Sequence, residues 1–186
     1  MTLAEVLVAM AVTSVVMVVA TAGIVGMYRT SNRADVLSNE MVQLQTAFQL
    51  LDRSVRYATA ISQPSASASP LGDWYVEWSS TAGTTATCSQ LRLDPSSGLL
   101  QRRSAAAGGA PGGWNTVASF LTATQPFTLQ PASTSGYPHQ RLTVDVTVRP
   151  PAGSSQLARR STFSFTALNT SLTTVSTGVC TQLDRP

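Results

Sequence analysis

The first 28 residues form an almost uninterrupted apolar stretch. Residues 1–28 read MTLAEVLVAMAVTSVVMVVATAGIVGMY, and their only charged side chain is that of Glu5. A membrane-spanning helix needs about 20 mostly apolar residues. A cleavable signal peptide has a basic start and an apolar core of about 7–15 residues, and this segment fits neither requirement. The pattern therefore predicts a retained transmembrane helix over residues 1–28.

Helical periodicity continues after this stretch, although the composition becomes polar. Apolar residues recur at alternating spacings of four and three, at Leu37, Met41, Leu44, Phe48, Leu51, Val55 and Ala58. The opposite positions carry Asn39, Gln43, Gln45, Asp52 and Arg56. Such a seam predicts an amphipathic continuation of the helix over residues 29–60 that docks on the rest of the chain. A two-stranded coiled coil is the alternative. The helix from about residue 2 to 60 would be roughly 85–90 Å long.

The remaining residues, 61–186, predict a β-rich head. Residues 63–70 (QPSASASP) have the composition of a loop. Short strands are predicted at Trp74–Trp78, Gln90–Leu93, Leu99–Arg103, Trp114–Ala123, Phe127–Gln130, Arg141–Arg149 and Ser161–Leu168. The segment DPSSG at 94–98 predicts a hairpin turn between the second and third of these. Strands without intervening helices favour an antiparallel sheet. The predicted fold class is α+β, with a long N-terminal helix packed on an antiparallel sheet.

Charge and composition exclude several function classes. The chain has 12 positive residues, all of them Arg, and a net charge of +3, which is too small to imply nucleic-acid binding by itself. Charged residues make up 11%, so the surface is polar mainly through Ser and Thr hydroxyls. One His and two Cys could not fill a zinc site without carboxylates. No metal or other cofactor is expected.

A search for catalytic motifs finds none. His139 lies in a loop without a nucleophile-elbow pattern. The Gly-rich segment 108–113 lacks the Lys of a phosphate-binding loop. The pairs Arg102–Arg103 and Arg159–Arg160 are predicted to be solvated strand ends. A DNA-binding groove would instead require them to converge with Trp74, Trp78 or Trp114. The expected function is therefore not enzymatic.

Glu5 is the unusual residue of the apolar helix. A carboxylate at membrane depth costs about 2.5–3.5 kcal/mol on insertion scales. Glu5 is expected either at the lipid–water boundary or paired with an α-amino group, its own or another subunit's. Arg29 and Arg33 follow the span, so positive-inside counting would place the head in the cytoplasm. A basic leader upstream of Met1 would remove that conflict.

Two pairs of small residues have structural interpretations. Gly23 and Gly26 each lower the stability of a helix by about 1 kcal/mol relative to Ala, and they indicate either a locally extended stretch or close helix packing.

Cys88 and Cys180 are either buried thiols or a disulfide. A Ser/Thr-rich head beyond a membrane helix favours an oxidising compartment and therefore the disulfide. Closing a loop of about 90 residues would stabilise the head by about 4–5 kcal/mol.

The opening residues, MTLAEVLVAMAV, resemble the N-terminus of mature type IV pilins and pseudopilins. Thr2, Leu3, Glu5, Val6 and Leu7 match the family pattern, while Met1 replaces the usual Phe. Many pilins have Pro at position 22, where this chain has Ala22, and Gly23 and Gly26 would supply comparable softness. Residues 44–58, LQTAFQLLDRSVRYA, and the later GLLQRR resemble J-type minor pseudopilins and W-type minor pilins.

The resemblance implies a mechanism of processing and assembly. A prepilin peptidase would cut before Met1 and methylate its amino group. Glu5 would neutralise a neighbouring subunit's N-terminus as subunits are added. The helix would then leave the inner membrane, where an assembly platform acts, and would enter the core of a filament.

The predicted function is that of a structural subunit of a type IV pilus-like or type II secretion filament. Its partners would be copies of itself or other pilins. It would be a single-pass protein of the cytoplasmic membrane with its head outside, and then part of a periplasmic or extracellular filament. Two alternatives stay open: a membrane-anchored binding module or adhesin, and a DNA-uptake pilin.

Overall fold

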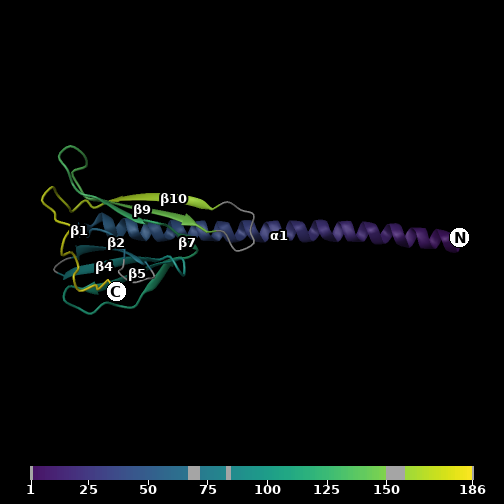
Figure 1. Ribbon diagram of the computed structural model, residues 1–186, viewed down its shortest axis with the longest axis horizontal. Coiled ribbons are helices and arrows are strands. Elements are labelled where there is room, and N and C mark those ends of the chain that lie inside the picture. Colours follow the sequence, from purple (N-terminus) through teal and green to yellow (C-terminus); the bar gives the residue numbers. More distant parts are fainter. Residues whose placement is uncertain (1, 67–71, 83–84, 150–157, 186) are drawn as a thin grey trace. The chain divides into compact units, whose positions relative to one another are not determined.

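One long helix and two antiparallel sheets form the described part of the protein. The computed structural model describes residues 2–66, 72–82, 85–149 and 158–185 (Figure 1). Helix α1 (Leu3–Arg56) has 54 residues and runs without a break from the first compact unit, Met1–Asn39, into the second, Glu40–Pro186. The helix ends four residues earlier than predicted, because the chain becomes extended at Ala58 and pairs with a strand of the head.

Strands of the head form two sheets where one was expected. The six-stranded sheet contains β1 (Ala58–Ile61), β2 (Ser65–Ala66), β3 (Trp74–Ala82), β4 (Thr85–Asp94), β5 (Leu99–Ala106) and β6 (Asn115–Ala118). Its order is β1-β3-β4-β5-β6, with β2 paired to β3. The four-stranded sheet contains β7 (Leu121–Thr122), β8 (Phe127–Gln130), β9 (Arg141–Val148) and β10 (Arg159–Thr166), in the order β10-β9-β7 with β8 also paired to β9. Every pairing is antiparallel, which confirms the α+β class.

The single strand predicted at Trp114–Ala123 is divided between the two sheets. Its first part is β6 and its second part is β7. Phe120, between them, has a φ of 59°, an uncommon conformation for a residue that is not glycine. This turn lets the chain leave one sheet and enter the other. The predicted loop 63–70 likewise contains a short strand, β2, and its residues 67–70 lie outside the described part of the chain.

The predicted hairpin between β4 and β5 is confirmed. The Asp94 side chain accepts hydrogen bonds from the backbone N–H groups of Ser96 (2.8 Å) and Ser97 (3.2 Å) and from both hydroxyls. Gly98 closes the turn with a φ of 70°, and a Cβ there would lie 3.0 Å from the carbonyl oxygen of Leu121. The position therefore requires glycine on both conformational and steric grounds.

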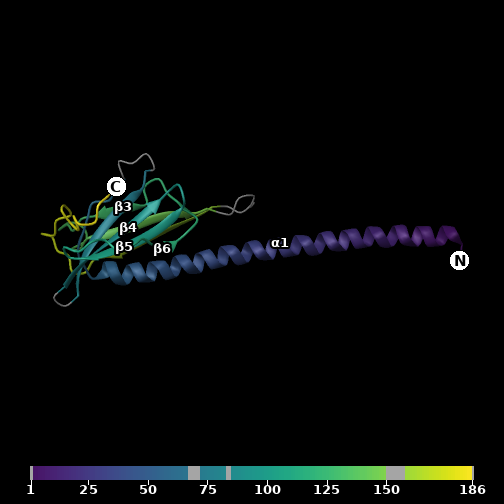
Figure 2. The ribbon, with the colours of Figure 1, turned by 90° about the horizontal axis from the view of Figure 1, so that it is seen from below.

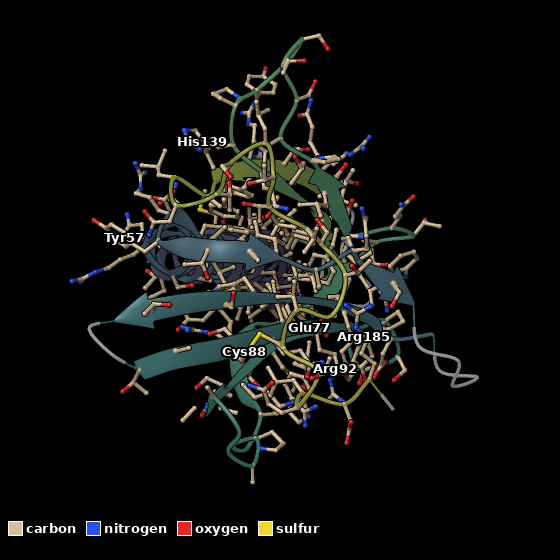
Figure 3. All side chains as sticks on the ribbon, turned by 90° about the vertical axis from the view of Figure 1, so that its left-hand side faces the viewer. Tyr57, Glu77, Cys88, Arg92, His139 and Arg185 are labelled. Atoms are coloured by element: carbon tan, nitrogen blue, oxygen red, sulfur yellow. A yellow bond between two sulfur atoms is a disulfide. The ribbon has the colours of Figure 1, made fainter. Side chains whose placement is uncertain are left out.

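The second half of α1 supplies one side of the core. Its buried residues are Leu44, Ala47, Phe48, Leu51 and Val55, and they share one cluster with side chains from both sheets. The two sheets lie on opposite sides of this part of α1 in Figures 1 and 3, and Phe48 stacks on Phe163 of β10. The predicted seam therefore docks on the head of its own chain. Its first members, Leu37 and Met41, have side chains outside the described set.

Candidate functional site

The first part of α1 is apolar and is not buried by the described part of the chain. Within the segment Leu3–Asn32, the most apolar 18-residue window has a mean hydropathy of 2.4, and none of that window is buried. By length and composition it is one helix that could cross a membrane. Large side chains along it, such as Leu7 (60% exposed) and Met27 (77% exposed), have no apolar environment in the isolated chain. Such a surface needs either lipid or another protein.

Glu5 lies in the first turn of this helix. Its carboxylate accepts a hydrogen bond from the backbone N–H of Thr2 at 2.8 Å, and the Thr2 hydroxyl lies 3.4 Å from the same oxygen. A Thr followed three residues later by Glu is the signature of a capping box, in which the acid returns to the N-cap amide. Sequence reasoning missed this local role, although Thr2 and Glu5 carried the signal. Met1 lies outside the described residues, so pairing of Glu5 with an α-amino group stays a prediction.

Gly23 and Gly26 lie within the continuous helix. Apart from the adjacent residues and the backbone of the same helix, no described atom lies within 4 Å of a Cβ built at either position, so neither glycine makes a close contact with another described part of the chain. Both residues are helical, and the locally extended stretch considered from the sequence is not seen. Close packing against another chain, and softness of the helix, stay predictions.

Cys88 and Cys180 are brought together by the end of the chain. Cys88 lies on β4, and the sulfur atom of Cys180 lies at disulfide distance from it, with the two Cα atoms 5.5 Å apart. A small apolar cluster surrounds the pair and includes Ala105 and Leu183. The C-terminal segment 176–185, called here the C-terminal tail, is thus held against the face of the six-stranded sheet that points away from α1.

A buried ion pair holds the C-terminal tail at a second point. Glu77 of β3 is only 2% exposed, and Arg185 contacts both of its carboxylate oxygens, one at 2.8 Å from Nε (Figure 3). The hydroxyl of Ser62 donates to the same carboxylate at 2.6 Å, and the Gln90 side chain donates at 2.7 Å. A carboxylate this deeply buried is stable only when it is paired and hydrogen-bonded, and here both conditions are met.

Arginines and tryptophans also converge on the six-stranded sheet. The guanidinium groups of Arg92 and Arg103 lie 4.3 and 4.4 Å from the ring centroid of Trp114, and that of Arg102 lies 5.7 Å from Trp78. The prediction that Arg102 and Arg103 are solvated strand ends is therefore wrong, because the sheet packs both side chains over aromatic rings. Burial lowers the pKa of both guanidinium groups. Trp78 is fully buried and offers no ring face to a nucleotide base.

Arg159 and Arg160, at the start of β10, are exposed as predicted, whereas Arg160 and His139 each have a structural partner. Arg160 forms an exposed ion pair with Asp145 on the neighbouring strand β9, and the hydrogen bond lowers the pKa of that carboxyl. His139 is half-buried, with its Nδ1 atom 2.6 Å from the carbonyl oxygen of Thr170. Within the described residues, no three His, Cys, Asp or Glu side chains gather into a potential metal site.

Comparisons with known proteins give no further guide. No protein-family model, curated protein or solved structure matches this chain significantly. The observed arrangement, a long apolar N-terminal helix whose second half packs on antiparallel sheets, is compatible with a pilin-like fold.

Proposed function

We propose that this protein is a structural subunit of a type IV pilin-like filament, assembled through the first half of α1. The observation that carries the proposal is the uncovered apolar segment Leu3–Asn32. Lipid would cover this surface while the subunit is stored in the membrane, and the helices of other subunits would cover it in the filament. The head would lie outside the cytoplasmic membrane, and other proteins would hydrolyse ATP for assembly.

Glu5 gives the proposal its chemical specificity. The carboxylate lies one turn from the start of an apolar helix, and the next charged residue in the sequence is Arg29. Thr2 supplies hydrogen bonds but no counter-charge. A buried charge without a partner is strongly destabilising, so burial in a filament requires a cation. The amino group of a neighbouring subunit would provide it.

A matched pair of substitutions in the native host tests this role. Glu5→Ala should reduce filaments recovered by shearing at least tenfold while the amount of protein in the membrane is unchanged. Arg149→Ala is the control, because Arg149 is an exposed charged residue of the head and lies outside the apolar segment Leu3–Asn32. Normal filament recovery from Glu5→Ala would instead support a membrane-anchored binding module.

Processing of the N-terminus gives an independent test. Mass spectrometry of the N-terminal peptide from native membranes should find Met1 with one added methyl group and no formyl group. An unprocessed or formylated start would contradict a pilin-like pathway, whatever the filament assay shows.

A further inference from the structure

A groove of about 600 Å³ lies between the second half of α1 and the edge of the six-stranded sheet. One wall is apolar and comes from the helix, where Val42 and Leu50 are 57% and 58% exposed. The other wall comes from β5 and β6 and carries polar side chains, including those of Ser104 and Asn115. Figure 2 shows β6 nearer to α1 than β3 is. The groove belongs entirely to the compact unit that contains the head.

Arg102 contributes a cation to this groove that has no acidic partner among the described residues. Its NH2 group donates to the hydroxyl of Ser89 at 3.0 Å, and its Nε atom is buried without a hydrogen-bond partner among the described residues. No described carboxylate lies within salt-bridge distance of it, and the described lining of the groove contains no acidic residue. A partly buried cation of this kind gains most from an anionic partner that also excludes water.

Strand β6 adds an unused hydrogen-bonding edge. It is the last strand in the sheet order, and within the described chain only β5 pairs with it. Asn115 lies opposite Arg102 in the β5–β6 register, so both side chains belong to the groove side of the sheet. A strand added beside β6 would place every second side chain on that same side. The residue opposite Asn115 would be two strand spacings, about 10 Å, from the backbone of Arg102.

We propose that the free edge of β6 and this groove bind an extended segment of a partner protein. The segment carries a carboxylate that pairs with Arg102, flanked at alternate positions by apolar side chains that cover Val42 and Leu50. Backbone hydrogen bonds to β6 supply part of the affinity, and the groove supplies the selectivity. This inference concerns only the compact unit Glu40–Pro186 and holds whether or not the filament function is correct.

An extended peptide fits these features better than a helix or a nucleic acid does. The backbone of a helix is already hydrogen-bonded internally, so it would leave the edge of β6 unused. A nucleic acid would place phosphates against Val42 and Leu50, where no cation is available on the helix wall. Arg103 also lines the groove, but its guanidinium donates to the Gln90 side chain and to the carbonyl oxygen of Asp184. The combination of the Arg102 cation, an apolar wall and a free strand edge therefore selects an acidic, alternating peptide.

The experiment uses full-length protein in phosphatidylcholine nanodiscs and a phage-displayed library of random octapeptides. Selected peptides are expected to contain Asp or Glu with apolar residues two positions away on either side. The best peptide is then synthesised, and its dissociation constant is measured. Enrichment of no sequence, or of sequences without an acidic residue, would overturn the proposal.

Matched variants then locate the binding site. Arg102→Gln should weaken the peptide at least tenfold, whereas Arg149→Gln, an exposed arginine outside the groove, should leave its affinity unchanged. Changing the peptide's acid to its amide should weaken binding to the unaltered protein by a similar factor, which excludes misfolding as the cause. N-methylation of alternate peptide amides should abolish binding in one register only. Equal affinity for the two arginine variants would show that the groove is not the site.

Discussion

The two faces of the six-stranded sheet are stabilised in different ways. The face toward α1 carries Val76, Trp78 and Leu91, all fully buried in one apolar cluster. The opposite face of the same strands carries Glu77 and Gln90, which are equally buried but hydrogen-bonded to each other. The inner face is covered by a helix that is next in sequence to the sheet, and the outer face by the last residues of the chain.

This difference separates two physical requirements. An apolar face needs only covering surface of matching shape, because the hydrophobic effect is not directional. A polar face needs particular donors and acceptors at particular positions, and a missing partner leaves a buried group unsatisfied. The outer face should therefore depend on individual residues of the C-terminal tail, whereas the inner face should depend on the volume of the residues that fill it.

The largest expected effect is the loss of the cross-link that holds the C-terminal tail. Cys88→Ala combined with Cys180→Ala should destabilise the head by about 4–5 kcal/mol, because the unfolded chain would no longer contain a closed loop of about 90 residues. Chemical denaturation of the oxidised protein, the reduced protein and the double variant measures this. Intact mass after alkylation without reductant should find no free thiol, and two alkylated cysteines would contradict the cross-link.

Truncation of a buried side chain on the inner face should have the next largest effect. Leu51→Ala should cost about 3–4 kcal/mol, because Leu51 is 1% exposed and truncation leaves a cavity. Leu50→Ala, one residue away and 58% exposed, should change stability by less than about 0.5 kcal/mol. Urea denaturation of the two variants gives the comparison, and equal losses would show that the helix does not dock as described.

Sequence patterns predicted the inner face far better than the outer one. The spacing of Leu44, Phe48 and Leu51 predicted a docking surface on the helix, and all three side chains are buried in the structure. Nothing near Glu77 indicates that its carboxylate is buried, because its partner Arg185 lies 108 positions later in the sequence. The tail around Arg185 also has no periodic pattern. Polar pairing between distant segments is therefore the part of this fold that one sequence does not reveal.

The candidate assembly site and the groove at Arg102 also differ in how far one sequence predicts them. The apolar run and Glu5 could be predicted because both lie in one short segment. The groove at Arg102 could not, since α1, β5 and β6 each contribute part of it. The pair Arg102–Arg103 was expected to be solvated. Strand alternation predicts the face of the sheet on which each side chain lies, but it does not show which segments of the chain cover that face.

Breaking the ion pair of the outer face should cost slightly less than a core truncation. Arg185→Gln should destabilise the head by about 3 kcal/mol, because it leaves Glu77 buried with only neutral donors. Adding Glu77→Gln to that variant should restore part of the loss, since no charge is then buried. Arg160→Gln serves as the control, because its ion pair with Asp145 is exposed. Thermal unfolding of the four proteins tests this, and the absence of any rescue would argue that the pair acts through packing alone.

The smallest expected effect on stability concerns the turn between β4 and β5, which lies outside both faces of the sheet. Partial burial raises the pKa of Asp94, but hydrogen bonds from Ser96 and Ser97 together outweigh it and lower the pKa to about 2. Because the pKa is lower in the folded state than the unfolded value of about 3.9, the stabilisation is complete above pH 5 and is lost as the pH falls toward 2. Solvent screening reduces this contribution to about 1 kcal/mol. Stability measured between pH 2 and 6 should therefore fall less steeply for Asp94→Asn than for the unaltered protein. If the free energy of unfolding falls equally steeply with pH in the two proteins, Asp94 does not contribute to the acid sensitivity of the fold.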